Sequence, residues 1–240
     1  MHVALATRGP PPIGVLPQSV PLEAVLGATR VGQEPWFVPL GIGDEQLEPV
    51  GFELYEGDHA LVAGTARSGK TTTLLLLAAL VARAHPKYTL IGVAVRPSKL
   101  RDCPELDRVI TAPEELPALV EELRTPGRGV AGNRFLLIDD AELVPDEGRA
   151  LTTLFADSVA GLHAIVAGRA DGVRSLGHWS AGVRRSRTGL LLQPDVQTDG
   201  ALLGVTLPRR PPPPVRPGCG YLVQGSGFEL VQVARPPLGT

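Results

Sequence analysis

Residues 64–71 read Gly-Thr-Ala-Arg-Ser-Gly-Lys-Thr, a full match to the phosphate-binding loop pattern G-x-x-x-x-G-K-[ST]. Residues 59–63 before it are a short, mostly apolar run that predicts a buried strand, and residues 72–84 after it predict a helix that stops at His85-Pro86. The motif has meaning only between a strand and a helix, and the sequence provides both. The alternative, a glycine-containing turn before an ordinary core helix, would leave this match to coincidence. We therefore predict that the chain binds a nucleoside triphosphate.

The residue types in this loop suit phosphate chemistry. Gly64 and Gly69 let the backbone curl close to a ligand, so that successive N–H groups point at phosphate oxygens, and the helix N-terminus adds partial positive charge. Lys70 is expected to reach the β- and γ-phosphates, and the Thr71 hydroxyl to ligate Mg²⁺. The predicted ATP-binding residues are Gly64, Thr65, Ala66, Arg67, Ser68, Gly69, Lys70, Thr71 and Thr72.

A second element, residues 134–140 (RFLLIDD), is an apolar run that ends in two carboxylates. A continuous apolar run is typical of a parallel strand that is buried on both faces. At the carboxyl end of such a strand, Asp139 is expected to hold Mg²⁺ together with Thr71. A core strand followed by an acidic turn is the alternative, and the presence of a phosphate loop in the same chain argues against it. The predicted catalytic residues are Lys70, Asp139 and Asp140.

Asp140 occupies the position at which P-loop ATPases of this type commonly carry the glutamate that polarises the attacking water. An aspartate is one methylene shorter, which sets its carboxylate back by roughly 1–1.5 Å. A displacement of about 1 Å can cost on the order of a hundredfold in rate. Glu142 is an alternative water-positioning group, although it lies beyond the end of the strand. The sequence thus supports ATP binding more strongly than rapid hydrolysis.

Composition narrows the class of protein. The 240 residues suffice for one α/β domain with a sizeable core. The net charge is −2, so a role in binding nucleic acid would have to rest on a local basic patch. The isolated Cys103 and Cys219 lack metal-ligand spacing and fit a reducing cytoplasm. Neither a secretory signal nor a membrane span is expected, since the longest apolar stretch, residues 74–82, belongs to the phosphate-loop helix.

The remaining elements are predicted from periodicity and turn signals, and the expected fold class is an α/β, RecA-like P-loop NTPase with a mostly parallel central sheet. The strands at residues 36–42 and 50–55 are expected to form a small β unit before the phosphate-loop strand, called the lead-in. A β-hairpin is expected to turn at residues 225–227 near the C-terminus. The helix near residue 116 is expected to start there, because Pro117 would otherwise lie too deep in it. The expected strands are residues 36–42, 50–55, 59–63, 89–95, 108–111, 134–140, 163–168, 190–193, 221–224 and 229–233, and the expected helices are residues 72–84, 116–123 and 146–160.

We predict two segments, an N-terminal linker or extension over residues 1–34 and the ATPase domain over residues 35–240. Residues 9–12 (GPPP) argue against regular structure near the N-terminus. Residues 208–214 (PRRPPPP) are expected to be extended, as a surface spacer or alternatively as an SH3-type ligand.

Several short sequence segments resemble the FtsK/SpoIIIE family of P-loop ATPases. VPLGIG (38–43) and LEPV (47–50) resemble the entry into the family's nucleotide-binding core, and GDHALVAG (57–64) its approach to the phosphate loop. GLHAIV (161–166) resembles the strand that ends in the sensor position, and PGCGYLV (217–223) the end of actinobacterial members. The resemblance covers roughly residues 35–235 and is closest to the C-terminal ATPase modules of type VII secretion motors of the EccC kind.

The resemblance implies a RecA-like sheet, ATP and Mg²⁺ as ligands, and neighbouring ATPase modules in the same chain or in an oligomer. It also implies a cytoplasmic module, with a membrane reached only through a larger complex, and a small helical secreted protein as substrate. Two departures set this chain apart. Asp140 replaces the catalytic glutamate, and Gly168-Arg169 stands where DNA translocases carry a polar Thr-Gln pair. Arg169, and the cluster Arg184, Arg185 and Arg187, are either trans-acting arginines or ordinary surface residues.

Three functions remain open at this stage. The favoured one is an ATP-binding module of a translocation motor for type VII protein secretion, with weak or regulated hydrolysis. The others are a DNA translocase domain and a substrate-docking module that does not hydrolyse its ATP. Basic residues near Arg184 and Arg209 could neutralise only a few phosphates, so DNA is the less favoured partner.

Overall fold

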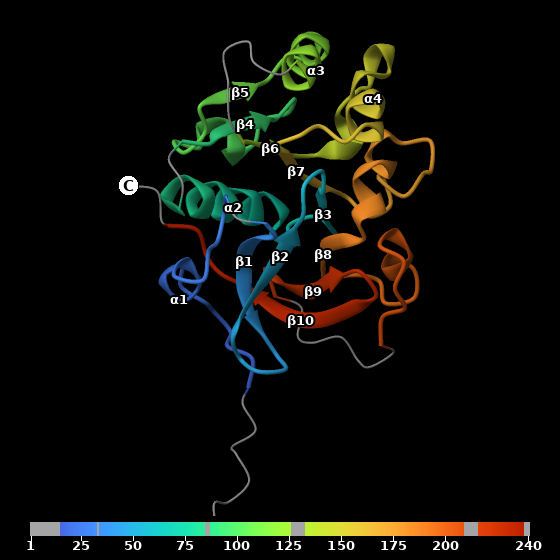
Figure 1. The fold of residues 1–240 in the computed structure, drawn as a ribbon. Helices are drawn as coiled ribbons and strands as arrows, with labels where there is room; N and C mark the ends of the chain where they lie inside the picture. Colours follow the sequence, from blue (N-terminus) through green and yellow to red (C-terminus); the bar gives the residue numbers. More distant parts are fainter. Residues whose placement is uncertain (1–14, 33, 85–86, 126–132, 209–215, 238–240) are drawn as a thin grey trace, which may run out of the picture.

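The computed structural model describes residues 15–32, 34–84, 87–125, 133–208 and 216–237. Its framework is one ten-stranded sheet in the order β2-β1-β10-β9-β8-β3-β7-β6-β4-β5 (Figure 1). The order β8-β3-β7-β6-β4 places β7 between the phosphate-loop strand β3 and the strand β6 that carries Asp139. This is the arrangement expected of a RecA-like P-loop NTPase, and the predicted fold class is confirmed.

The parallel half of the sheet is built from apolar strands that are buried on both faces, as the sequence predicts. Within it, β3 pairs with β7 on one side and with β8 on the other, and all three run in the same direction. The remaining pairs, β7 with β6, β6 with β4, and β4 with β5, are also parallel. The strands are β3 (Ala60–Gly64), β4 (Thr89–Val93), β5 (Arg108–Ile110), β6 (Arg134–Ile138), β7 (Leu162–Gly168) and β8 (Thr188–Leu192).

The antiparallel half continues the same sheet beyond β8. The predicted lead-in is the pair β1 (Trp36–Gly43) and β2 (Pro49–Leu54), and the predicted hairpin is β9 (Cys219–Gln224) and β10 (Gly227–Val233). The lead-in does not stand apart, because β1 pairs with β10, and the hairpin in turn joins the parallel half through β9 and β8. Segments from the two ends of the chain therefore lie side by side.

The helices form two layers, one on each face of the sheet. Alternate residues of β3 divide between two apolar clusters: Ala60 and Val62 join one that includes α2, and Leu61 and Ala63 join one that includes α3 and α4. The α-helices are α1 (Glu23–Leu26), α2 (Lys70–Ala84), α3 (Leu116–Arg124) and α4 (Ala150–Ala156). Short 3-10 turns are η1 (Lys99–Asp102), η2 (Pro113–Glu115), η3 (Ala141–Leu143), η4 (Glu147–Arg149), η5 (Trp179–Ala181), η6 (Val183–Ser186) and η7 (Asp199–Leu202).

The helix predicted over residues 146–160 is wrong in its extent. Gly148 and Arg149 have φ angles of 61° and 60°, so the regular helix begins only at Ala150. Asp146 accepts hydrogen bonds from the backbone N–H groups of Leu151 and Thr152, which satisfies donors at this helix start. The helix ends at Ala156, four residues before the predicted end, and Asp157 is extended.

Other boundaries differ by smaller amounts. Strand β8 starts at Thr188, and Gln193 falls outside it with a φ angle of 47°. Strands β4 and β5 end at Val93 and Ile110, before the predicted residues 95 and 111. The start of α3 at Leu116 is confirmed, with Pro117 in its first turn. His85-Pro86, residues 9–12 and residues 209–214 lie outside the described residues.

The described part of the predicted N-terminal segment packs on the rest of the chain. Val20, Leu22 and Val25 are buried in the same apolar cluster as α2. Val20 bridges Ala234, and Arg30 bridges Phe37. The boundary at residue 34 remains a prediction.

Among the described residues, none of the helices has both the length and the apolar character needed to cross a bilayer.

Candidate nucleotide-binding site

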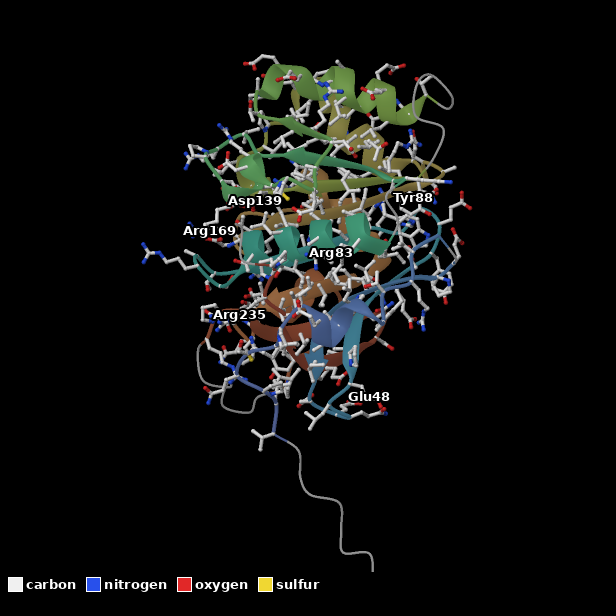
Figure 2. The ribbon with its side chains drawn as sticks, turned by 90° about the vertical axis from the view of Figure 1, so that its left-hand side faces the viewer. Glu48, Arg83, Tyr88, Asp139, Arg169 and Arg235 are labelled. Atoms are coloured by element: carbon white, nitrogen blue, oxygen red, sulfur yellow. The ribbon has the colours of Figure 1, made fainter. Side chains whose placement is uncertain are left out.

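The carboxyl ends of β3, β6 and β7 bring the predicted site residues to one edge of the sheet. Because parallel strands all end at the same edge, residues far apart in the sequence meet there. Figure 2 shows Asp139 and Arg169 at this edge, whereas Tyr88, just before β4, lies at the opposite edge. The loop between β3 and α2 contributes the phosphate-binding motif to the same place.

Lys70 is the first residue of α2, and its side chain folds back over the loop. Its Nζ donates to the carbonyl oxygens of Thr65 at 2.8 Å and of Gly64 at 3.3 Å. Lys70 is only 8% exposed, and burial lowers the pKa of its ammonium group, while the carboxylates of Glu142, Asp139 and Asp140 act in the opposite direction. The ammonium group is therefore poorly hydrated and held inside the curl of the loop.

Asp139 is the meeting point of three segments. Its Oδ2 accepts hydrogen bonds from Thr71 Oγ1 at 2.8 Å and from Ser98 Oγ at 2.6 Å. Its backbone N–H donates to the carbonyl oxygen of Val93 on β4, which fixes its place at the end of β6. Asp139 is 2% exposed, so these two hydroxyls neighbour a buried carboxylate.

Hydroxyl and carboxylate oxygens are the donors that Mg²⁺ prefers, and Thr71 and Asp139 are already in contact. Within the described ranges no group of three or more His, Cys, Asp or Glu side chains could hold a metal ion. Mg²⁺ commonly binds through one or two protein ligands plus substrate phosphates, so this donor set suits a metal ion that arrives with a nucleotide.

Asp140 follows Asp139 in a left-handed conformation, with a φ angle of 49°. Burial raises the pKa of the Asp140 carboxyl, and the nearby carboxylates of Asp139 and Glu142 raise it further, while Lys70 and Arg96 oppose this. Asp140 thus belongs to the same electrostatic cluster as Lys70.

Glu142 is held beside this cluster by the segment that follows β7. Its Oε2 accepts a 2.9 Å hydrogen bond from the backbone N–H of Arg169. Glycines make room for it: a Cβ atom at Gly172 would lie 2.5 Å from Glu142 Cβ, and one at Gly168 would lie 3.0 Å from Glu142 Oε2. The Glu142 carboxylate, the alternative to Asp140 for positioning water, is therefore held in a defined place beside the cluster.

The phosphate loop also contacts the C-terminal hairpin. The backbone N–H of Gly218 donates to the carbonyl oxygen of Ser68 at 2.9 Å, and Gly218 has a φ angle of 77°. A Cβ atom at Gly69 would lie 3.1 Å from Gly218 N. The residue that precedes β9 is thereby hydrogen-bonded to the phosphate loop.

The remaining loop residues are placed as follows. Thr65, Ala66, Arg67 and Thr72 are exposed, and Arg67 has a φ angle of 61°. Ser68 is fully buried, and its hydroxyl has no hydrogen-bond partner among the described residues.

Two residues of the site were missed from the sequence, Ser98 and Gly218. Ser98 follows β4 and lies at the same edge of the sheet as Asp139. A polar residue shortly after a predicted parallel strand is the sequence signal that could have identified it. In the sequence, Gly218 stands out only as part of the family-like segment at residues 217–223. Its contact with Ser68 joins positions that the sequence separates widely, so no local pattern indicates it.

No family model matches the chain. A curated relative, the ESX-4 secretion system protein EccC4 of Mycobacterium tuberculosis, is 30% identical over an alignment 258 positions long, which covers 95% of this chain and 20% of the relative. The chain is a homologue of the EccC proteins of type VII secretion systems. The resemblance to FtsK/SpoIIIE-type ATPase modules of the EccC kind is thereby confirmed.

Further matches agree with this assignment. The ESX secretion system protein EccC of Thermomonospora curvata is 27% identical over 95% of this EccC homologue and 19% of the relative. A solved structure of ATPases 2 and 3 of Thermomonospora curvata EccC, in complex with a signal sequence peptide, has a TM-score of 0.70 at 24% identity and covers 95% of this chain and 45% of that one. The EccC homologue thus spans about a fifth of the length of these curated relatives.

Proposed function

We propose that this chain is an ATP-binding module of a type VII secretion motor and that its isolated form hydrolyses ATP slowly. The observation that carries the proposal is the joint position of Lys70, Thr71 and Asp139. Lys70 lies inside the phosphate loop, and Thr71 donates to Asp139 at the end of β6. This is the arrangement that P-loop NTPases use for nucleotide phosphates and Mg²⁺. The kinship with EccC supports the secretion context.

The residues have distinct roles in the proposed reaction. Lys70 exchanges the carbonyl oxygens of Gly64 and Thr65 for β- and γ-phosphate oxygens. Backbone N–H groups of residues 64–72 surround the phosphates, and Thr71 and Asp139 hold Mg²⁺. When bound, Mg²⁺ neutralises charge on the β- and γ-phosphate oxygens. Ser98 orients the Asp139 carboxylate through its 2.6 Å hydrogen bond.

Hydrolysis is expected to be slow because neither of the two carboxylates that could orient the attacking water, Asp140 and Glu142, is well placed to do so. Asp140 is short and has left-handed backbone geometry. Glu142 is longer, but one of its oxygens already accepts a hydrogen bond from Arg169. Neither group is therefore free and well placed, and a neighbouring module or substrate is expected to raise the rate.

The partners we propose are neighbouring ATPase modules, in the same chain or in an oligomer, and a helical export signal of a secreted protein. The solved EccC complex with a signal sequence peptide supports the second partner. A cytoplasmic location is proposed on the same ground, with any link to the membrane made by a larger complex. The relatives found are secretion proteins, and the net charge of −2 gives no general attraction for DNA.

Titration calorimetry with ATP, with and without Mg²⁺, tests the nucleotide part of the proposal. Saturable binding that Mg²⁺ strengthens is expected, and no binding under either condition overturns it. Fluorescence titration with a helical export-signal peptide and with a DNA duplex tests the cargo. We expect peptide binding that tolerates salt and no DNA complex at about 0.15 M salt. DNA binding that persists at that salt would instead support a DNA translocase.

A further inference from the structure

Gly218 separates the phosphate loop from the end of β10 by the width of one residue. Its backbone N–H donates to the carbonyl oxygen of Ser68 at 2.9 Å, and its own carbonyl oxygen accepts from the N–H of Val233 at 2.7 Å. A Cβ atom at Gly218 would lie 3.5 Å from Val233 Cβ. Residues 217–219, at the start of β9, and residues 233–235, at the end of β10, thus form one flank of the phosphate loop.

Arg235, in this flank, lies at the same edge of the sheet as the phosphate loop. Strand β9 is antiparallel to β8, and β10 is antiparallel to β9, so β10 runs in the direction of β8 and β3 and ends where they end. Figure 2 shows Arg235 on the side of Asp139, with Tyr88 on the opposite side. Arg235 and Pro217 are exposed, and among the described residues the Arg235 guanidinium group has no hydrogen bond or ion pair.

The strand order gives the direction in which a bound nucleotide must run. Mg²⁺ bridges the β- and γ-phosphates, and its expected ligand Asp139 follows β6, which lies on one side of β3 with β7 between them. Strands β8, β9 and β10 lie on the other side of β3. A nucleotide whose γ-phosphate points toward Asp139 therefore directs its sugar and base toward the flank.

The backbone of the flank offers no hydrogen-bond donor to a base. Pro217 has no N–H group, and the other N–H groups of the flank already donate to protein carbonyl oxygens. These are the N–H groups of Gly218, Cys219, Val233, Ala234 and Arg235. The exposed surface is the proline ring with its neighbouring glycine, together with a planar guanidinium group, and guanidinium planes stack on nucleobases.

We propose that the sugar and base of a bound nucleotide lie against Pro217 and Gly218 and that Arg235 stacks its guanidinium group on the base. The inference rests on the proposed nucleotide site and adds the part of it that binds the nucleoside. Because stacking uses the face of the ring, the chain recognises purine nucleoside triphosphates as a class and discriminates weakly between adenine and guanine. Arg235 adds nothing to the binding of inorganic tripolyphosphate, which has no base.

The test compares the affinities of the full chain for ATP, GTP, UTP and inorganic tripolyphosphate, by calorimetry with saturating Mg²⁺. The wild type should bind ATP about tenfold or more tightly than tripolyphosphate, a gain typical of stacking on one base. ATP and GTP should agree within about threefold, and UTP should bind more weakly because its single ring offers a smaller face. Arg235→Ala should weaken ATP and GTP by about fivefold or more and leave tripolyphosphate within about twofold.

Arg83 supplies a matched control. It is exposed in the last turn of α2, at the far end of that helix from the phosphate loop, and it also makes no ion pair among the described residues. Arg83→Ala should leave all four affinities unchanged. Arg235→Lys keeps the charge and loses the planar group, so it should bind ATP more weakly than the wild type. Thermal unfolding checks that each variant is folded.

The outcomes separate this inference from the proposed function. Equal affinity of the wild type for ATP and tripolyphosphate would overturn the inference and leave the phosphate loop assigned. An unchanged ATP affinity in Arg235→Ala, an equal loss for tripolyphosphate, or full rescue by Arg235→Lys would also overturn it, because Arg235 would then contribute nothing or charge alone. A preference for ATP over GTP of more than about tenfold would contradict recognition by stacking, since it requires hydrogen bonds to the base. A wild-type chain that binds none of the four ligands would overturn both proposals.

Discussion

Thr71 Oγ1 donates a 2.8 Å hydrogen bond to Asp139 Oδ2, across 68 residues of sequence. The bond joins the first turn of α2 to the end of β6 and brings together the two side chains that the sequence predicts as Mg²⁺ ligands. A hydroxyl and a carboxylate at this distance can share one ion with only small adjustments. The predicted pairing of the phosphate loop with the acidic strand end is thus visible in the geometry.

The first prediction tests whether the Asp139 carboxylate binds Mg²⁺. Asp139→Asn retains an oxygen that accepts from Thr71 and Ser98 but removes the negative charge. We expect ATP to bind the variant with the same affinity in the presence and absence of Mg²⁺, as measured by calorimetry. Ser98→Ala removes one of the two hydrogen bonds to Asp139 Oδ2 and the acceptor of the Leu100 N–H, and should reduce the Mg²⁺ effect by a few-fold at most. Undiminished strengthening of ATP binding by Mg²⁺ in Asp139→Asn would show that the ion binds elsewhere.

The second prediction concerns the rate of hydrolysis. Asp140→Glu extends the carboxylate by one methylene, and single-turnover measurements should show a faster rate, by up to about a hundredfold if reach alone limits the wild type. Asp140→Asn should not give this gain. Glu142→Gln, measured in parallel, shows whether the alternative carboxylate carries the residual activity. Vigorous turnover by the isolated wild-type chain would contradict this account of Asp140.

A third prediction uses two glycines with positive φ angles. Gly218 and Gly225 have φ angles of 77° and 61°, so alanine at either is strained by about 1–2 kcal/mol. A Cβ atom at Gly218 would also lie 3.1 Å from Gln232 Nε2, whereas one at Gly225 has nothing within 4 Å. Both variants should unfold at a lower denaturant concentration. Only Gly218→Ala should also weaken ATP binding, because its N–H contacts Ser68. Equal ATP affinity in the two variants would argue against coupling between the hairpin and the loop.

The fourth prediction concerns stability in acid. His59 is 4% exposed, and its Nδ1 accepts a hydrogen bond from the backbone N–H of Ala164. Burial, with a smaller contribution from the neighbouring His163, lowers the pKa of His59 to about 4. An unfolded chain takes up this proton near pH 6.5 and the folded chain does not. The free energy of unfolding should therefore be unaffected above pH 6.5 and should fall by about 3 kcal/mol as the pH drops to about 4.

Denaturant titrations of wild type and His59→Asn at several pH values check this. Asparagine offers an oxygen to the Ala164 N–H and does not titrate, so the variant should lose less stability between pH 6.5 and 4 than the wild type. Carboxylates contribute to both proteins and cancel in the difference. Parallel curves for the two proteins would rule out His59 as the source.

The sequence predicts best where one local pattern fully specifies an element. The phosphate loop at residues 64–71 and the buried strand β6 have patterns of this kind, and both are placed as expected. The predicted helix over residues 146–160 is too long, because its apolar positions begin only at Leu151 and the backbone of Gly148 and Arg149 before them is left-handed. Contacts between segments that are distant in the sequence have no local sequence pattern that predicts them. The hydrogen bond from Ser98 to Asp139 and the one from Gly218 to Ser68 depend on how the strands are ordered in the sheet.

The most direct test of the central claim is the affinity of Lys70→Met for Mg²⁺ with ATP, measured by calorimetry beside Lys87→Met. Methionine keeps the apolar stem of Lys70, which is buried, but cannot donate to Thr65 or to a phosphate, and thermal unfolding checks that the variant is folded. Lys87 is exposed just before β4, at the other edge of the sheet. We predict that Lys70→Met loses detectable ATP binding and that Lys87→Met binds ATP like the wild type. A folded Lys70→Met protein with wild-type affinity would contradict the assignment of residues 64–72 as the nucleotide site.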